Sequence, residues 1–416
     1  MVGPTGDKHH IESNMTKDVL NDDDRDEASF DLGFATRAIR GELERASAST
    51  PGRPVPLCGR PIDQNDRIRS SFGQEDDISV VTNEGVAANL AGLEGAEAGL
   101  VLGSGPSALT ALFRATTSPG DRILVQTSAC TATTVLMQAI LSSLGVEMVV
   151  VDFAGNANLR EAVNSRTRLV YLETPSNPLN GIVDISAVSA QARNHGLIVA
   201  VDSTFASPVL QRPIEHGADV VFHSFAKYIN GHGDTMGGGL FGDRDLISRV
   251  RAVARAADDR QARLNLDAAH LILRGLKTLA LRMEKHSTSA HAVALTLESH
   301  PAVKWVRYPF LSSHPDAVTA KRQMSGGSGM IAFGLNAGEI GTRHVVERLR
   351  LFSASLSCGE VGSLVCTSAD LSTARHISLQ GSELCETLGE DVIRLSVGLE
   401  DAEDLIEDLW HALSVV

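Results

Sequence analysis

Asp202 and Lys227 are two residues whose types and spacing suggest covalent chemistry. Asp202 follows the apolar run 197–201, which is typical of a buried parallel strand, and ligands of such sheets bind at the carboxyl ends of the strands. Lys227 follows a second run, 219–222, and lies among small and apolar residues, where an amine can form an imine. A carboxylate near that lysine could keep a pyridinium nitrogen protonated, as pyridoxal phosphate (PLP) chemistry requires.

Each of these residues, taken alone, also has an ordinary structural interpretation. A strand-end aspartate is commonly a cap, and a single lysine is commonly a surface group. His223 and His232 flank the lysine segment, but no carboxylate or cysteine lies at metal-ligand spacing with them, so no metal site is predicted. Ser224-x-x-Lys227 also fits the Ser-x-x-Lys pattern of penicillin-recognising acylases, but the partner motifs Ser-Asp-Asn and Lys-Thr-Gly are absent.

The composition is typical of a soluble enzyme. The chain has 416 residues, 43% of them hydrophobic, enough for two or three packed units. The formal net charge of −14 argues against nucleic acid or an anionic membrane as a partner. The five cysteines form no C-x-x-C pair, which favours reduced thiols. Without an apolar run of membrane-spanning length or a signal core, the expected location is the cytoplasm.

The elements that position Asp202 and Lys227 follow from the apolar periodicity. Residues 1–30 are polar and acidic and are expected to be a disordered leader, followed by an N-terminal arm over 31–82 that includes the proline-rich segment 51–62. Residues 83–265 alternate apolar runs with helical segments, which predicts a mainly parallel α/β domain. Its strands are expected at 122–125, 147–151, 169–172, 197–201 and 219–222. Residues 266–416 are expected to form an α+β domain with a long helical stretch over 266–299, strands at 329–335 and 393–398, and a closing helix at 401–413.

Several further blocks accompany the lysine segment, and together they resemble the transsulfuration (Cys/Met metabolism) family of PLP enzymes. That family includes cystathionine γ-synthases, cystathionine lyases, methionine γ-lyases and O-acylhomoserine sulfhydrylases. The resemblance covers roughly residues 30–416 and implies the aspartate-aminotransferase-like α/β fold, fold type I. The blocks are LEGAEAG at 93–99, GSG at 103–105, YLETPSNP at 171–178, LRGLKTL at 273–279, KRQM at 321–324 and RLSVGLED at 394–401.

The resemblance implies roles for residues around the cofactor. Lys227 matches the lysine that forms the internal aldimine with PLP and shuttles the Cα proton, and Asp202 matches the partner of the pyridine nitrogen. Ser224 matches a phosphate-binding hydroxyl. Ser104 and Gly105 match the turn whose backbone N–H groups bind the phosphate.

Other matching positions concern the ring and the substrate. Glu173 and Asn177 match residues that support the ring face and its O3′. Arg394 matches the arginine that holds the substrate α-carboxylate in a bidentate pair, and Ser357 lies where the family helps to bind that carboxylate.

The sequence departs from the family pattern at the phosphate site. Where the family has a Tyr-x-Arg pair that reaches the neighbouring subunit's PLP, an ungapped count places Glu75 and Asp77, which would repel a phosphate. A gapped alignment would bring in Arg67 or Arg69 instead.

Further departures affect the cofactor turn and ring. The family's methionine in the Ser-Gly-Met turn is Pro106, which has no N–H, and the threonine before the lysine is Ala226. Ser128 replaces the stacking tyrosine, and Cys130 falls where methionine γ-lyases carry a cysteine.

These departures leave two hypotheses open. In the first, the chain is a PLP enzyme with an altered cofactor pocket that performs γ- or β-replacement or elimination on a sulfur amino acid or O-acylhomoserine-type substrate. Ser128, a water or Lys227 would then protonate the leaving group. In the second, it is a non-catalytic homologue or subunit that has lost efficient PLP binding. We favour the enzyme because Lys227, Asp202 and Arg394 are all present, and we expect a homodimer or homotetramer.

Overall fold

The structure is a computed structural model that describes residues 75–126, 132–153, 159–257, 262–371, 391–414 and 416. All of these belong to one unit, Phe34–Val416. The predicted leader, most of the predicted arm and the candidate residue Ser128 lie outside the described residues.

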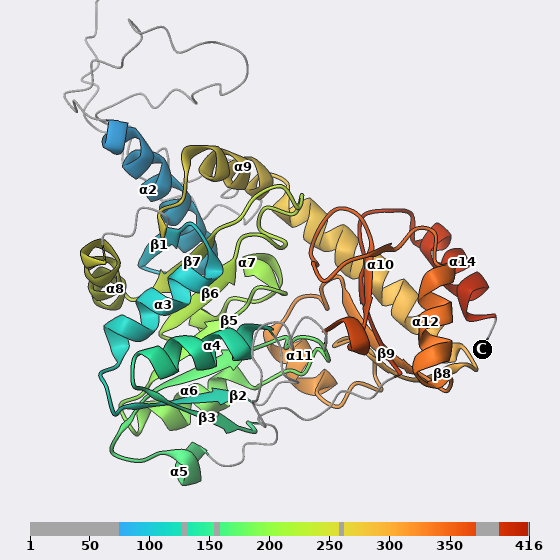
Figure 1. Ribbon diagram of the computed structural model, residues 1–416, viewed down its shortest axis with the longest axis horizontal. Coiled ribbons are helices and arrows are strands. Elements are labelled where there is room, and N and C mark those ends of the chain that lie inside the picture. Colours follow the sequence, from blue (N-terminus) through green and yellow to red (C-terminus); the bar gives the residue numbers. More distant parts are fainter. Residues whose placement is uncertain (1–74, 127–131, 154–158, 258–261, 372–390, 415) are drawn as a thin grey trace, which may run out of the picture. The chain divides into compact units, whose positions relative to one another are not determined.

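A seven-stranded sheet forms the first part of the described chain (Figure 1). The five predicted strands are confirmed and run parallel in the order β6, β5, β4, β2, β3. The carboxyl ends of these strands therefore meet at one edge, which is where the site lies. The strands are β2 (Arg122–Gln126), β3 (Glu147–Val151), β4 (Thr167–Glu173), β5 (Ile198–Asp202) and β6 (Val220–Ser224).

Helices cover both faces of this sheet because neighbouring strand residues point to opposite sides. In β2, Ile123 packs with helices α3 (Gly105–Thr116), α4 (Ala132–Ser143) and α8 (Arg244–Ala256). Its neighbour Leu124 packs with α5 (Leu159–Ala162) and α6 (Ile185–Arg193) on the other face. The remaining short elements are α7 (Ser207–Leu210) and the 3-10 helix η3 (Pro213–His216).

Two strands of this sheet were not predicted, β1 (Ala98–Leu102) and β7 (Gly238–Gly242). Strand β7 is antiparallel to both β1 and β6. Its glycines permit close approach, because a Cβ on Gly238 would lie 2.6 Å from the Cα of Gly105. The start of α3 can therefore lie directly on β7, beside the end of β6.

A second sheet has the strand order β10, β11, β12, β9, β8 and is antiparallel except for the β10–β11 pair. The predicted strands at 329–335 and 393–398 correspond to β9 and β12. The predicted closing helix is α14 (Ala402–Leu413). The strands are β8 (Val303–Arg307), β9 (Met330–Leu335), β10 (Ser353–Ala354), β11 (Leu364–Thr367) and β12 (Val392–Ser396), with α11 (Ala317–Gln323) and α12 (Gly338–Arg348) between them.

The predicted helical stretch over 266–299 is two helices, α9 (Leu266–Leu276) and α10 (Leu279–Ser299). Thr278 interrupts it with φ −111° and ψ 3°, so the chain changes direction there. An apolar repeat does not reveal a break this short, because only Lys277 and Thr278 separate the two helices.

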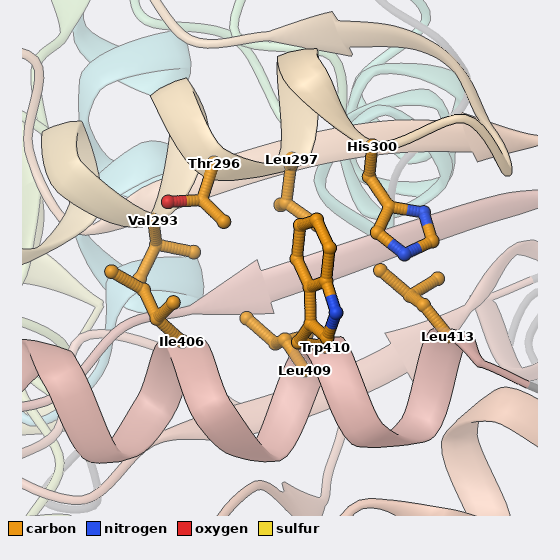
Figure 2. A pocket seen from close by; sticks show the side chains of 8 residues that line it. All are labelled: Val293, Thr296, Leu297, His300, Ile406, Leu409, Trp410 and Leu413. Carbon is orange, nitrogen blue, oxygen red and sulfur yellow. The ribbon is translucent and has the colours of Figure 1, made fainter.

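Helix α2 (Glu75–Glu94) runs through residue 82, where the predicted N-terminal arm ends. Helices α10 and α14 pack against the second sheet, and Figure 2 shows their side chains facing one another across a small, mainly apolar gap. The rings of His300 and Trp410 meet edge to face there, with centroids 4.6 Å apart. Among the described residues, no helix is long and apolar enough to cross a bilayer.

Candidate active site

Asp202 is the last residue of β5 and is almost fully buried at the carboxyl edge of the first sheet. Its Oδ1 accepts a 2.9 Å hydrogen bond from the Thr204 N–H, and its Oδ2 accepts one of 3.1 Å from the Tyr171 hydroxyl. Burial raises the pKa of the Asp202 carboxyl, and it also raises the pKa of Tyr171. Since burial makes the charged carboxylate costly, a cationic partner at this position would be strongly favoured.

Lys227 is half-buried in the turn that follows β6. Its Nζ lies 3.4 Å from the hydroxyl oxygen of Ser357, a residue of the loop between β10 and β11. The backbone of that loop passes close by, because a Cβ on Gly359 would lie 3.2 Å from the Cβ of Lys227. The lysine turn therefore contacts the segment that carries the predicted substrate-binding serine.

The start of α3 forms a narrow backbone turn beside the end of β6. A Cβ on Gly105 would lie 3.1 Å from the Phe222 ring and 3.8 Å from the Cβ of Ser224, so a larger residue would crowd that ring. Ser104 caps the helix, and its Oγ accepts a 3.2 Å hydrogen bond from the Ser107 N–H. The three predicted phosphate residues, Ser104, Gly105 and Ser224, thus lie together.

Arg394 lies in β12, and only 3% of it is exposed. Its Nη1 donates to Oδ1 of Asn177 (3.1 Å), and its Nη2 donates to the carbonyls of Leu356 (2.9 Å) and Ser357 (3.1 Å). The Nε atom is buried with no protein acceptor among the described residues. Backbone and amide oxygens therefore accept from three of the five guanidinium N–H groups, and two N–H groups remain for a ligand.

Glu173 and Asn177 extend this arrangement back to the first sheet. Oε1 of Glu173, the last residue of β4, accepts a 3.0 Å hydrogen bond from the Asn177 N–H. Burial, followed by the charge of Asp202, raises the pKa of Glu173 to about 8. A small cavity lined by Gln126, Tyr171, Glu173 and four residues of β2 and α4 opens beside them.

The structure brings together nine of the ten predicted site residues, and the tenth, Ser128, lies outside the described residues. Sequence reasoning missed Tyr171 and Thr204, which bind the Asp202 carboxylate. Tyr171 could have been found, because it lies two residues before Glu173 in one strand and so shares its face.

The positions at which the sequence departs from the family pattern lie in different elements of the structure. Pro106 occupies the first turn of α3, where its missing N–H is tolerated, and its side chain is exposed. Glu75 and Asp77 belong to α2, and Ala226 directly precedes Lys227 in the turn. His223 forms a fully buried pair with Glu94, and no group suited to a metal ion occurs among the described residues.

A lysine and a buried carboxylate at the carboxyl edge of a mainly parallel sheet are typical of PLP-dependent enzymes of fold type I. The chain belongs to the Cys/Met metabolism family of PLP-dependent enzymes, because the model of that family matches residues 78–414. The predicted family, fold class, cofactor and assignment as an enzyme are confirmed.

Curated relatives and solved structures agree with this family. An L-methionine γ-lyase of Pseudomonas deceptionensis is 40% identical over 328 residues, which are 79% of this chain and 82% of that protein. A cystathionine γ-synthase of Mycobacterium leprae is 38% identical over 389 residues, 92% of this chain and 97% of that protein. The crystal structure of a Xanthomonas oryzae pv. oryzae cystathionine γ-synthase with cystathionine is 32% identical, has a TM-score of 0.80, and is matched over 92% of this chain and 98% of its own.

Proposed function

We propose that this protein catalyses γ-elimination or γ-replacement, or the related β chemistry, on a sulfur amino acid or an O-acylhomoserine-type substrate. The observation that carries this proposal is the position of Ser357. Its carbonyl accepts from Nη2 of Arg394, and its hydroxyl lies 3.4 Å from Nζ of Lys227. A substrate carboxylate bound at Arg394 would therefore leave the α-amine and Cα close to Lys227.

The residues of the site fit PLP. The buried Asp202 carboxylate can accept from a protonated ring nitrogen, which would supply the cation that its surroundings favour. The turn at Ser104 and Gly105, where a Cβ on Gly105 would be crowded, and the nearby Ser224 hydroxyl can receive a phosphate at the start of α3. Lys227 would hold the aldehyde covalently, and Glu173 and Asn177 would support the ring and its O3′. When bound, PLP supplies the electron sink for carbanions at Cα.

The chain's own residues then bind the substrate and move its protons. Arg394 binds the α-carboxylate, with Ser357 beside it. Lys227, once its amine is free, takes the proton from Cα as a general base. Protonation of the leaving group would fall to Ser128, a water or Lys227.

The relatives favour chemistry at the γ carbon, since their names are methionine γ-lyase and cystathionine γ-synthase. They give no support to a non-catalytic subunit or to loss of PLP binding.

Product analysis tests the proposal. The purified protein with PLP is incubated with methionine, with cystathionine, with cysteine, and with an O-acylhomoserine plus cysteine. A keto acid with ammonia indicates elimination, and a new thioether amino acid indicates replacement. Absence of any PLP-dependent product with all four mixtures, from protein that binds PLP, would contradict the proposal.

We propose a homodimer or homotetramer in the cytoplasm, with the amino acid as the small-molecule partner. Light scattering of the purified protein measures the assembly directly, and a monomer that turns over substrate would contradict it.

A further inference from the structure

Arg282 in α10 is a buried cation that serves no role in the proposed reaction. Only 4% of it is exposed, and within the described ranges its side-chain hydrogen bonds all go to neutral oxygens. Nη1 donates to the Tyr228 carbonyl (2.7 Å), Nη2 to the carbonyls of Ile229 (3.3 Å) and Gly275 (2.9 Å), and Nε to the hydroxyl of Thr278 (3.1 Å). A buried charge is costly, so such a complete set of acceptors indicates a specific structural purpose.

Two of these acceptors belong to the residues directly after Lys227. The segment is a tight turn, in which the Gly231 N–H donates to the Lys227 carbonyl (2.7 Å) and the Asn230 N–H to that of Phe225 (3.1 Å). The turn also needs glycine beside the arginine, since Gly231 has φ 77° and a Cβ there would lie 2.0 Å from Nη1 of Arg282. The guanidinium thus binds the carbonyls that the turn itself leaves free, as a cation does at a helix end.

One turn further along α10, His286 contacts Val397, the residue directly after the strand that carries Arg394. Its Nδ1 lies 2.8 Å from the Val397 carbonyl, and because a carbonyl only accepts, Nδ1 must donate. Burial lowers the pKa of His286 to about 4, so the ring is neutral near pH 7. The ring also meets Tyr228 edge to face, with centroids 5.1 Å apart.

We propose that Arg282 is a positioning residue that fixes the turn after Lys227, and that α10, through Arg282 and His286, sets the lysine amine relative to Arg394. The inference rests on the proposed role of Lys227 in binding PLP. In this proposal the guanidinium binds three carbonyls at once through Nη1 and Nη2. A single ammonium at the end of a lysine side chain cannot reproduce this forked geometry.

The test compares R282M, R282K and the milder T278V, which removes the acceptor of Nε together with the 3.3 Å hydrogen bond that the Thr278 hydroxyl donates to the Gly275 carbonyl. The control is L297A, which creates a cavity in the distal half of the same helix without touching the lysine turn. Hydrogen exchange at the Asn230 and Gly231 amides is measured in the protein without PLP. The pH midpoint of the imine absorbance is measured in the protein with PLP.

We expect R282M and R282K to raise exchange at both amides by about tenfold or more and to move the midpoint by about one pH unit, with T278V showing a smaller change in the same direction. L297A should lower the melting temperature and leave the midpoint in place. If R282M does not fold, R282K and T278V decide the outcome. Midpoints and local exchange equal to those of L297A would overturn the inference. Absence of an imine band in the wild type would instead reject the role of Lys227, and the exchange measurement would still test the turn.

Discussion

The hydroxyl of Tyr171 in β4 donates a 3.1 Å hydrogen bond to Oδ2 of Asp202 in the neighbouring strand β5. Together with the Thr204 N–H on Oδ1, it holds both oxygens of a buried carboxylate that forms no salt bridge within the described part of the chain. This arrangement orients the carboxylate and lowers the cost of its charge. It also makes Tyr171 a determinant of the proposed interaction between Asp202 and a protonated ring nitrogen.

Replacing Tyr171 with Phe removes one charge-assisted hydrogen bond and leaves the ring packing intact. We expect PLP affinity to fall by roughly tenfold, because such a bond contributes about 1.5 kcal/mol. Equilibrium dialysis of PLP measures the effect. An unchanged dissociation constant would show that the Tyr171 bond does not support Asp202 in cofactor binding.

Replacing Arg394 with Ala removes the proposed carboxylate clamp. We expect kcat/KM for amino-acid substrates to fall by about 30-fold or more, since loss of a buried charged pair costs about 2–5 kcal/mol. Binding of PLP should be retained. The control is R343K, which alters an exposed arginine paired with Glu339. Equal kinetics for the two variants would remove Arg394 from the site.

Pro106 offers a gain-of-function test at the phosphate turn. Replacing it with Ala adds an N–H in the first turn of α3 while leaving the Ser104 cap in place. We expect PLP to bind up to about tenfold more tightly, as one hydrogen bond to a charged group contributes about 1.5 kcal/mol. A weaker or equal affinity in fluorescence titration would mean that the phosphate does not use this part of the turn.

His286 predicts how stability depends on pH. Its pKa is about 4 in the folded protein and 6.5 when unperturbed, so the unfolded chain takes up a proton first as the pH falls. Stability from this residue is therefore present above pH 6.5 and is lost as the pH falls toward 4, by about 3 kcal/mol in all.

The measurement for His286 is urea unfolding between pH 4 and pH 7. The variant H286N keeps an N–H that can reach the Val397 carbonyl but cannot titrate, so its stability should decline less over this range. Parallel curves for the wild type and H286N would refute the assignment.

The positions of candidate site residues could be predicted from the sequence where those residues follow a buried strand. Asp202 and Lys227 could be located because apolar runs precede them, and the family blocks supplied Glu173, Asn177 and Arg394. Strand β7 was missed because its glycines lack the side chains that make a strand recognisable, yet those glycines admit the Ser104–Gly105 turn.

Residues whose partners are distant in the sequence were also missed. Arg282 resembles a surface residue of a helix, and only the tertiary structure shows that its acceptors are the carbonyls of Tyr228 and Ile229. The break between α9 and α10 at Thr278 also leaves no sign in the apolar pattern of the sequence. Sequence periodicity reports which face is buried and not which oxygen a buried charge will meet.

The central claim is that Lys227 binds PLP covalently, and reduction of the purified protein with borohydride followed by peptide mass spectrometry tests it most directly. We predict a visible imine band that borohydride abolishes, with the pyridoxyl mass on the peptide containing Lys227 and no label in the K227A variant. A pyridoxyl group on another lysine, or turnover that survives in K227A, would contradict the account.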